Sequence, residues 1–147
     1  MVNLSRQVLC LVYAVIAGLA LVGTWGNNIQ YLNLGFVGAN LRFWQDTFAN
    51  PASRSITVDL FFLMLAATVW MLLEARKLSM KGAWLYVLFA MLIAVSVTFP
   101  IFMIHRERTL ASRDGSAQGG TLSTWDLIGL GALALVMLVY TLQSLHR

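Results

Sequence analysis

Charged residues are scarce in this sequence. Only 11% of the 147 residues are charged, whereas 59% are hydrophobic and the mean hydropathy is +0.76. Soluble globular domains carry roughly a quarter charged residues, and disordered tails and nucleic-acid binders need charge as well. The composition therefore predicts an integral membrane protein whose first partner is the lipid bilayer, and it argues against a nucleic-acid partner.

Metal-binding and redox residues are equally few. Cys10 is the single cysteine, so an intrachain disulfide and CxxC-type spacings are excluded. The two histidines, His105 and His146, are expected on opposite faces of the membrane, which argues against a zinc or haem site. Phosphate-binding loops, nucleophile elbows and HExxH are absent too. We therefore expect no metal and no cofactor.

Long apolar runs are what the sequence has in abundance. A membrane-spanning helix needs about 20 predominantly apolar residues, and four stretches qualify, at about residues 8–25, 56–73, 84–104 and 125–142. The predicted fold is an all-α integral membrane four-helix bundle. We expect residues 1–110 to form a three-helix unit, residues 111–124 a flexible linker, and residues 125–147 the fourth helix with a short tail.

Two helix starts can be read from capping residues. Asn50 followed by Pro51 fits an N-cap and the first helical position, where proline's missing N–H costs nothing. Ser123 with Asp126 three residues later is a variant of the capping box. Both patterns predict that a helix begins there.

The two longer connections differ in character. In the first, residues 26–55, apolar side chains recur at helical spacing at Val37, Leu41, Trp44 and Phe48, which favours an amphipathic helix lying on the bilayer surface or capping the bundle. Arg42 and Asp46 are four residues apart and off that stripe. The second connection, residues 111–124, is small, polar and glycine-rich, as in a flexible linker.

The orientation of the chain depends on a charge count. Four spans put both termini on one side, with the loops after the first and third spans on the other. The terminal side then holds Arg6, Arg76, Lys77, Lys81 and Arg147, against Arg42, Arg54, Arg106, Arg108 and Arg113. Acids break the tie, because five bases and one acid, Glu74, leave +4 whereas the other side balances to zero. With the short basic turn at residues 76–81, this predicts both termini in the cytoplasm.

Two residues stand out inside the apolar runs. Asp59 is an acid inside a predicted span, where a charged side chain is energetically unfavourable. It therefore either has a function or reaches the interface and is hydrogen-bonded there. Pro100 removes a ladder hydrogen bond and frees the carbonyl of Ser96, which predicts a kink in the third span. The kink either serves packing alone or opens a polar pocket. Glu74, at the end of the second span, is expected to pair with one of the bases that follow it, Arg76, Lys77 or Lys81.

One possible site combines residues of opposite charge. Asp59, His105 and Glu107 are the candidate catalytic residues, because a histidine and carboxylates could perform acid–base chemistry. The candidate substrate-binding residues are the amides, the aromatic residue and the charged groups expected at the same membrane face: Asn27, Asn28, Trp44, Arg106, Arg108 and Asp126.

Residues spread over the first three apolar stretches resemble those of a known family. The run Asn50-Pro51-Ala52-Ser53, followed by Asp59, Trp70, Glu74-Ala75-Arg76, Trp84-Leu85-Tyr86, Ser96, Pro100 and Arg106-Glu107, resembles the small bacterial membrane proteins catalogued as domain of unknown function 2834. The likeness covers about residues 8–110. It implies a multi-helix membrane protein with no established activity. We assign a structural role to Trp70, Glu74, Arg76, Trp84, Tyr86, Ser96 and Pro100.

Three functions remain open. The leading hypothesis is a small interaction or accessory subunit of a bacterial inner membrane, whose helices pack against a membrane protein partner or a second copy. The alternative is an enzyme or binding protein for a lipid-soluble, isoprenoid-like substrate, using Asp59 and the 105–108 cluster beneath the aromatic segment. A small transporter is the third.

Overall fold

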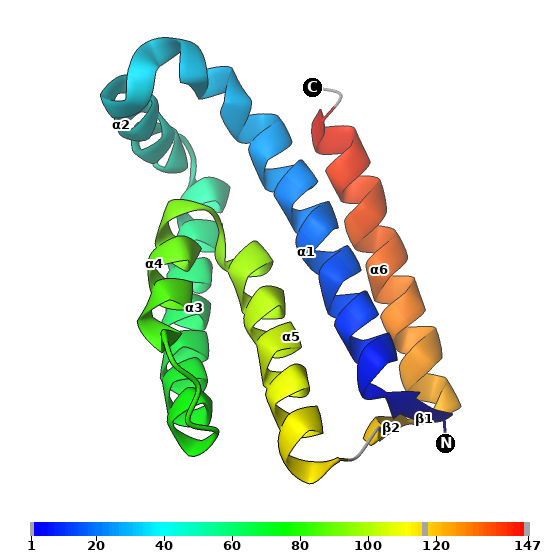
Figure 1. Ribbon diagram of the computed structural model, residues 1–147. Coiled ribbons are helices and arrows are strands. Elements are labelled where there is room, and N and C mark those ends of the chain that lie inside the picture. Colours follow the sequence, from blue (N-terminus) through cyan, green and yellow to red (C-terminus); the bar gives the residue numbers. More distant parts are fainter. Residues whose placement is uncertain (1, 116–117, 146–147) are drawn as a thin grey trace.

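Helices make up most of the molecule. The computed structural model describes residues 2–115 and 118–145. Its helices are α1 (Arg6–Asn28), α2 (Gly35–Thr47), α3 (Pro51–Lys77), α4 (Ala83–Leu92), α5 (Val95–Asp114) and α6 (Thr124–Leu145), and the 3₁₀ helix η1 (Ile29–Leu34) joins α1 to α2. Figure 1 shows them arranged in an open array. The predicted all-α class is confirmed.

The two capping patterns mark real helix starts. Asn50 accepts a hydrogen bond from the Ser53 amide at 2.9 Å, and Pro51 is the first residue of α3. At the start of α6, Asp126 accepts from the Ser123 amide at 2.7 Å and Ser123 Oγ accepts from the Asp126 amide at 3.1 Å. Each cap satisfies backbone groups that the helix itself leaves unpaired.

The third predicted span, residues 84–104, is wrong as a single helix. The chain leaves the helical conformation at Ile93 and Ala94, where Ala94 is extended with φ −179° and ψ 142°, and α5 then runs back beside α4. Pro100 lies six residues beyond this break, inside α5. Hydropathy did not reveal the reversal because α4 and the N-terminal half of α5 are both apolar.

The hairpin reduces the number of helices able to cross a membrane. α4 has ten residues, about 15 Å at 1.5 Å per residue, which is half of a hydrocarbon layer of about 30 Å. Among the described residues, three helical stretches are long and apolar enough to span, namely Arg6–Thr47, Pro51–Lys77 and Thr124–Leu145. The structure therefore has three candidate spans and an α4–α5 hairpin, and the predicted four-helix bundle is not confirmed.

A small antiparallel sheet was not predicted. Strand β1 (Val2–Ser5) pairs with β2 (Gln118–Leu122), with Val2 opposite Leu122 and Leu4 opposite Gly120. A Cβ on Gly119 would clash with Leu9 and lie 3.3 Å from the backbone of Arg6, so glycine allows β2 to approach the start of α1. The predicted linker at 111–124 thus contains the last turn of α5 and a strand.

The two ends of the array can now be named. The sheet end comprises the sheet, the start of α1, the turn between α3 and α4 and the C-terminal half of α5, and the α2 end lies opposite (Figure 1). Val2 lies at the sheet end, whereas Leu145 approaches Gly26 at the α2 end. Val2 and Leu145 thus lie at opposite ends of the array, whereas the prediction put both termini on one side.

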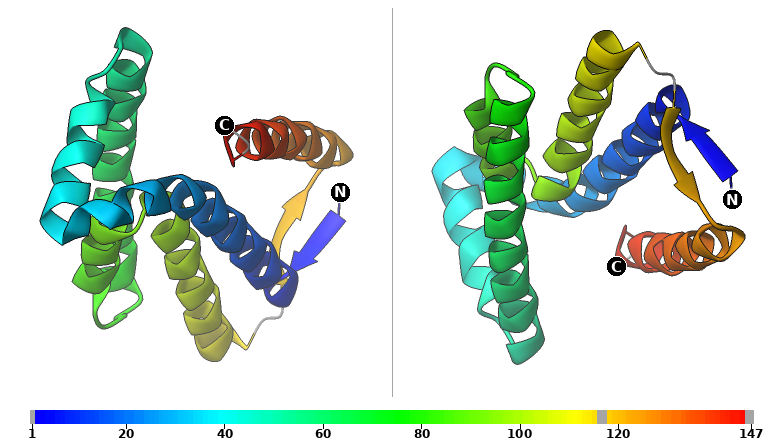
Figure 2. Two further views of the ribbon diagram at one scale, coloured as in Figure 1. Left: turned by 90° about the horizontal axis from the view of Figure 1, so that it is seen from above. Right: turned by 90° about the horizontal axis from the view of Figure 1, so that it is seen from below.

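The hydrophobic core lies between α3, α4 and α5. Met71, Ala75 and Phe102 are buried there, and the partly buried residues around them are Met80, Ala83, Tyr86, Val87, Phe99 and Met103. The views in Figure 2 show α5 and α6 on different sides of α1, with α6 on the side away from α3. The core therefore depends on the α4–α5 hairpin, and α6 takes no part in it.

Candidate functional site

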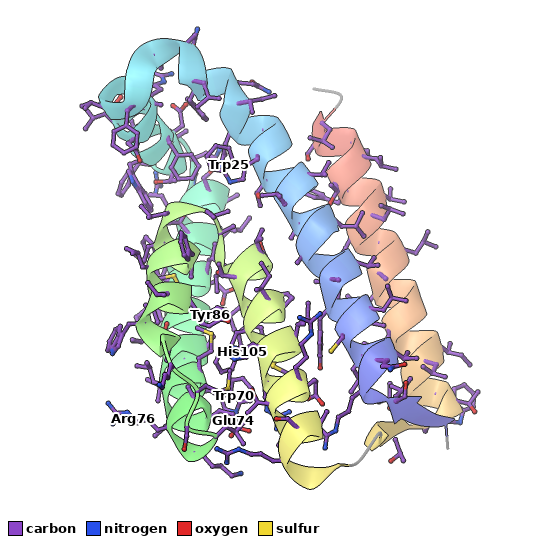
Figure 3. The ribbon with its side chains drawn as sticks, viewed as in Figure 1. Trp25, Trp70, Glu74, Arg76, Tyr86 and His105 are labelled. Carbon is purple, nitrogen blue, oxygen red and sulfur yellow. The ribbon has the colours of Figure 1, made fainter. Side chains whose placement is uncertain are left out.

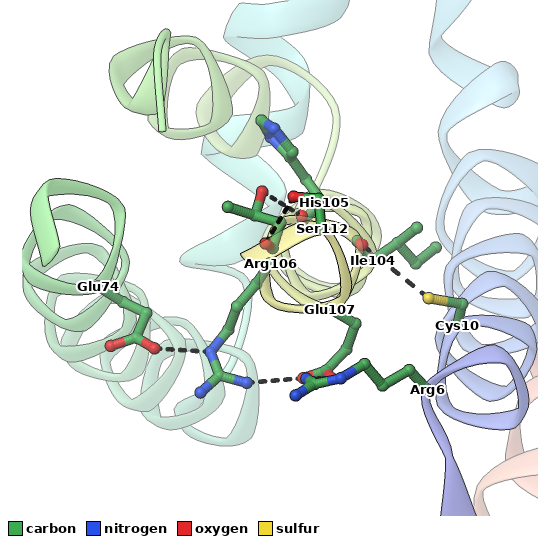
Figure 4. A network of polar contacts seen from close by, with 9 residues as sticks. Arg6, Cys10, Glu74, Ile104, His105, Arg106, Glu107 and Ser112 are labelled. Carbon is green, nitrogen blue, oxygen red and sulfur yellow. Dashed lines mark hydrogen bonds and ion pairs between the residues drawn. The ribbon is translucent and has the colours of Figure 1, made fainter. Parts of the chain in front are cut away.

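Four charged side chains from three helices form one network at the sheet end. Arg106 Nε donates to Glu74 Oε1 at 2.8 Å, and Arg106 Nη1 donates to Glu107 Oε1 at 2.6 Å. Glu107 Oε2 accepts from Arg6 Nη1 at 2.9 Å. Figure 4 shows these ion pairs in their spatial order, Glu74, Arg106, Glu107 and Arg6, which joins α3 to α5 and α5 to α1. We call these four residues the ion-pair network.

Glu107 is the centre of this network. The residue is 2% exposed, and its carboxylate lies between two guanidinium groups. A buried carboxylate is tolerated only when counter-charges and hydrogen bonds replace its lost hydration. The network contains two bases and two acids, so its charges neutralise one another.

Helical spacing positions the neighbouring aromatic residues. Trp70 lies one turn before Glu74 on α3, and the Arg106 guanidinium lies 5.9 Å from the centre of the Trp70 ring. Trp70 also contacts Phe102 at 5.9 Å between ring centres. On the other side of α5, the Tyr86 hydroxyl lies 2.9 Å from His105 Nδ1 (Figure 3). Trp70, Glu74 and Tyr86, for which a structural role was predicted, thus contact residues of α5.

The expected partners of Glu74 are corrected. We expected it to pair with Arg76, Lys77 or Lys81, but it binds Arg106, a residue 32 positions away. The α4–α5 hairpin is the reason, because it returns residues 105–108 to the end where α3 finishes. An unbroken third span would have carried them to the other end of the array.

The predicted binding residues do not converge. Asn27 donates to Ser144 Oγ at 3.3 Å at the α2 end, where Asn28 precedes η1 and Trp44 contacts Phe61 with ring centres 5.8 Å apart. The 105–108 cluster and the capping residue Asp126 lie at the sheet end instead. The expectation that all of these residues emerge together at one face is therefore wrong.

Asp59 is also separate from the cluster. It is exposed on α3, 15 residues before Glu74 and hence about 22 Å away along the helix axis. Within the described part of the chain it has no ion pair or hydrogen-bond partner. The aromatic segment containing Trp44 consequently does not cover the 105–108 cluster, although α2 is helical as predicted and Arg42 pairs with Asp46 at 3.2 Å.

The remaining structural candidates have different environments. Pro100 is buried in α5, whereas Ser96, whose carbonyl loses the proline N–H, is exposed. Trp84 is 64% exposed at the start of α4, and Arg76 is exposed near the end of α3. An exposed tryptophan and arginine at helix ends are compatible with contacts to the bilayer interface.

Arg6 is the residue of the network that sequence reasoning missed. It was counted only as loop charge, yet its side chain is 12% exposed and reaches across to α5. The available signal in the sequence was a charged residue in the first turn of an apolar helix. That helix begins at Arg6, because Ser5 caps it by accepting a hydrogen bond from the Val8 amide. Sequence alone gave no indication of the residue across from it.

Two open grooves border these features. One, of about 310 Å³, is lined by Arg6, Gln7, Cys10, Glu107, Arg108 and Ala111 at the sheet end. The other, of about 300 Å³, is lined by Tyr31, Phe43, Asp46, Thr47, Ser53, Ile56 and Thr57 at the α2 end. In residues 2–115 and 118–145, no three His, Cys, Asp or Glu side chains lie together as a metal site would need; His146 is outside this part.

Comparison with known proteins places this arrangement in a family. No curated protein and no solved structure matches the chain. A family model described as a protein of unknown function, DUF2834, matches residues 12–108. The match includes Glu74, Arg106 and Glu107 of the ion-pair network and ends before the sheet strand β2 and α6. The chain therefore belongs to the DUF2834 family.

Proposed function

We propose that this protein is a small accessory subunit of a membrane complex, and that α6 is the helix that binds its partner. The network of ionisable residues is paired internally, and the two grooves are open, so neither supports a catalytic reaction. α6, by contrast, has no buried residue along its length. Because α6 contacts α1 without burying any of its own residues, most of its surface is available for another protein.

One face of α6 carries the proposal. Trp125, Gly129, Ala132, Val136 and Tyr140 are spaced by four, three, four and four residues, so they share one helix face. The large members of this face are very exposed, at 80% for Trp125, 67% for Val136 and 70% for Tyr140. Contacts to α1 come from Thr141 and Leu145, which lie off the face. We call it the outer face of α6.

The outer face has the composition of a membrane helix interface. Small residues allow close backbone approach between helices in lipid, where packing rather than water exclusion drives association. A Cβ built on Gly129 meets nothing within 4 Å, so this space is open for a partner. Interfacial tryptophan and tyrosine near the two ends of the face would hold the helix at a constant depth.

The experiment is purification of the tagged full chain from native membranes in mild detergent, with quantitative mass spectrometry of everything retained. We expect a stoichiometric membrane protein, or a second copy, that is lost in Gly129→Leu. The matched control is Gly131→Leu, the same change in open space two residues away and off the outer face. A wild-type protein that purifies as a monodisperse monomer without a partner contradicts the proposal, as does equal loss in the two variants.

The residues on which the two alternative functions depend do not lie together. An enzyme for an isoprenoid-like substrate was to combine Asp59 with the 105–108 cluster, but these lie at different levels of the array. A transporter needs a polar path across the bilayer. Among the polar residues of the apolar stretches, Asp59 and Ser96 are exposed, and the Thr98 hydroxyl donates to the Ala94 carbonyl at 2.8 Å. We therefore propose neither.

The distribution of basic residues supports an orientation in a bacterial inner membrane. The α2 end has Arg42 and Arg54, whereas the sheet end gathers Arg6, Arg76, Lys77, Lys81, Arg106, Arg108 and Arg113. Arg147 lies outside the described residues. The tie between the two sides is thereby broken, because the hairpin returns the basic part of α5 to the end of α3. By the positive-inside rule the sheet end faces the cytoplasm.

A further inference from the structure

The groove between α1 and α5 contains a base that the ion-pair network does not use. Arg108 is exposed, and within residues 2–115 and 118–145 its guanidinium makes no ion pair or hydrogen bond. The acid in the same groove, Glu107, is already paired with Arg6 and Arg106. The groove therefore presents a positive charge that is not paired with an acid in the described part of the chain.

Hydrogen-bond donors in the groove suit a phosphate. Arg108 offers a planar guanidinium that can bind two phosphate oxygens at once. Gln7, which is exposed on the α1 wall, can donate from its amide. The pairing of Glu107 with two arginines lowers its repulsion of an anion. A volume of about 310 Å³ is sufficient for a phosphate-bearing headgroup.

Apolar side chains continue from the groove along both helices. On α1, Leu11 follows Gln7 by four residues and is 65% exposed. On α5, Ile104 and Ile101 precede Arg108 by four and seven residues, and Ile101 is 43% exposed. Residues at these spacings share a helix face. A lipid with an anionic headgroup and apolar acyl chains matches this order, with the charge in the groove and the apolar residues beyond it. A free phosphate would not contact the apolar residues.

We propose that the α1–α5 groove binds the headgroup of an anionic phospholipid, with Arg108 as the main phosphate ligand and the acyl chains lying on Leu11, Ile101 and Ile104. The position of the groove at the sheet end places the headgroup in the cytoplasmic leaflet, which is rich in anionic lipid and attracts basic residues. This site does not depend on the partner proposed for α6.

The test is native mass spectrometry of the full chain titrated with phosphatidylglycerol or with phosphatidylcholine of the same acyl chains. Wild type should retain phosphatidylglycerol preferentially. Arg108→Gln should weaken that retention about tenfold or more, since a hydrogen bond to a charged group accounts for a factor of this order. Ala111→Trp, at another exposed position of the groove, should weaken it by occupying the space.

The matched control is Arg76→Gln, which removes an exposed arginine from the same end of the molecule but not from the groove. It should leave retention unchanged. Equal retention of the two lipids would overturn the proposal, and so would an equal loss in Arg76→Gln, which would mean diffuse attraction to the basic end. Displacement by inorganic phosphate at the concentration of the lipid would identify a free phosphate as the ligand and overturn the lipid assignment.

Discussion

Neutralising the central carboxylate of the ion-pair network should destabilise the fold strongly. Glu107 is 2% exposed and accepts from two arginines, at 2.6 and 2.9 Å. Glu107→Gln keeps the size of the side chain but removes the buried negative charge that lies between the Arg6 and Arg106 guanidinium groups. Breaking a buried ion pair in this way costs about 3–5 kcal/mol. Because Arg106 retains Glu74, we expect the low end, about 3 kcal/mol of unfolding free energy.

The chain provides a matched control for this prediction. Asp46 also accepts from two donors, Arg42 Nε at 3.2 Å and the Tyr31 hydroxyl at 3.0 Å, but its side chain is 37% exposed. Water compensates the loss there, so Asp46→Asn should cost below about 1 kcal/mol. The assay is reversible unfolding of each variant in mixed micelles by titration with a denaturing detergent. Equal losses in the two variants, or a stabilised Glu107→Gln, would refute the argument that burial sets the energy.

Further predictions concern packing, backbone strain and orientation. Phe102→Ala should lower the free energy of unfolding by about 3 kcal/mol, because removing the fully buried ring leaves a cavity. Phe62→Ala, at a residue 69% exposed, should lower it little. The same unfolding assay compares the two variants. Ser79 has a φ of 50° in the turn between α3 and α4, so Ser79→Gly should stabilise by about 1 kcal/mol, and a lower unfolding midpoint would contradict this. In a cysteine-free background, Ser112→Cys should react with an impermeant thiol reagent only from the cytoplasmic side and Asn33→Cys only from the other; labelling of both from one side would contradict the proposed orientation.

Much of the helical structure could be predicted because it depends on neighbouring residues. Asn50, Pro51, Ser123 and Asp126 act on backbone groups within one turn, so the starts of α3 and α6 could be read directly from the chain. The helical stripe at 37–48 correctly indicated α2, and the pair Arg42–Asp46 follows from its four-residue spacing. The strands β1 and β2 could not be foreseen, because their pairing joins segments more than a hundred residues apart.

The candidate site could be predicted only in part. Glu107 was predicted as a candidate catalytic residue, and Glu74, Trp70 and Tyr86 as structural residues. The partner of Glu74 was misassigned, because a straight span over 84–104 would place residues 105–108 and residue 74 at opposite ends. Arg6 was missed because its role depends entirely on a contact across to α5.

The sequence by itself determined that the chain is apolar, helical and compatible with a membrane, because helix caps and hydrophobic length are local properties. Only the tertiary structure decided the direction of α5 after the break at Ala94, and with it which charges meet. Hydropathy is the same for a helix that continues and for one that turns back. The two arrangements differ in whether Glu107 reaches Arg6 and Arg106 reaches Glu74, and a buried carboxylate such as Glu107 requires counter-charges.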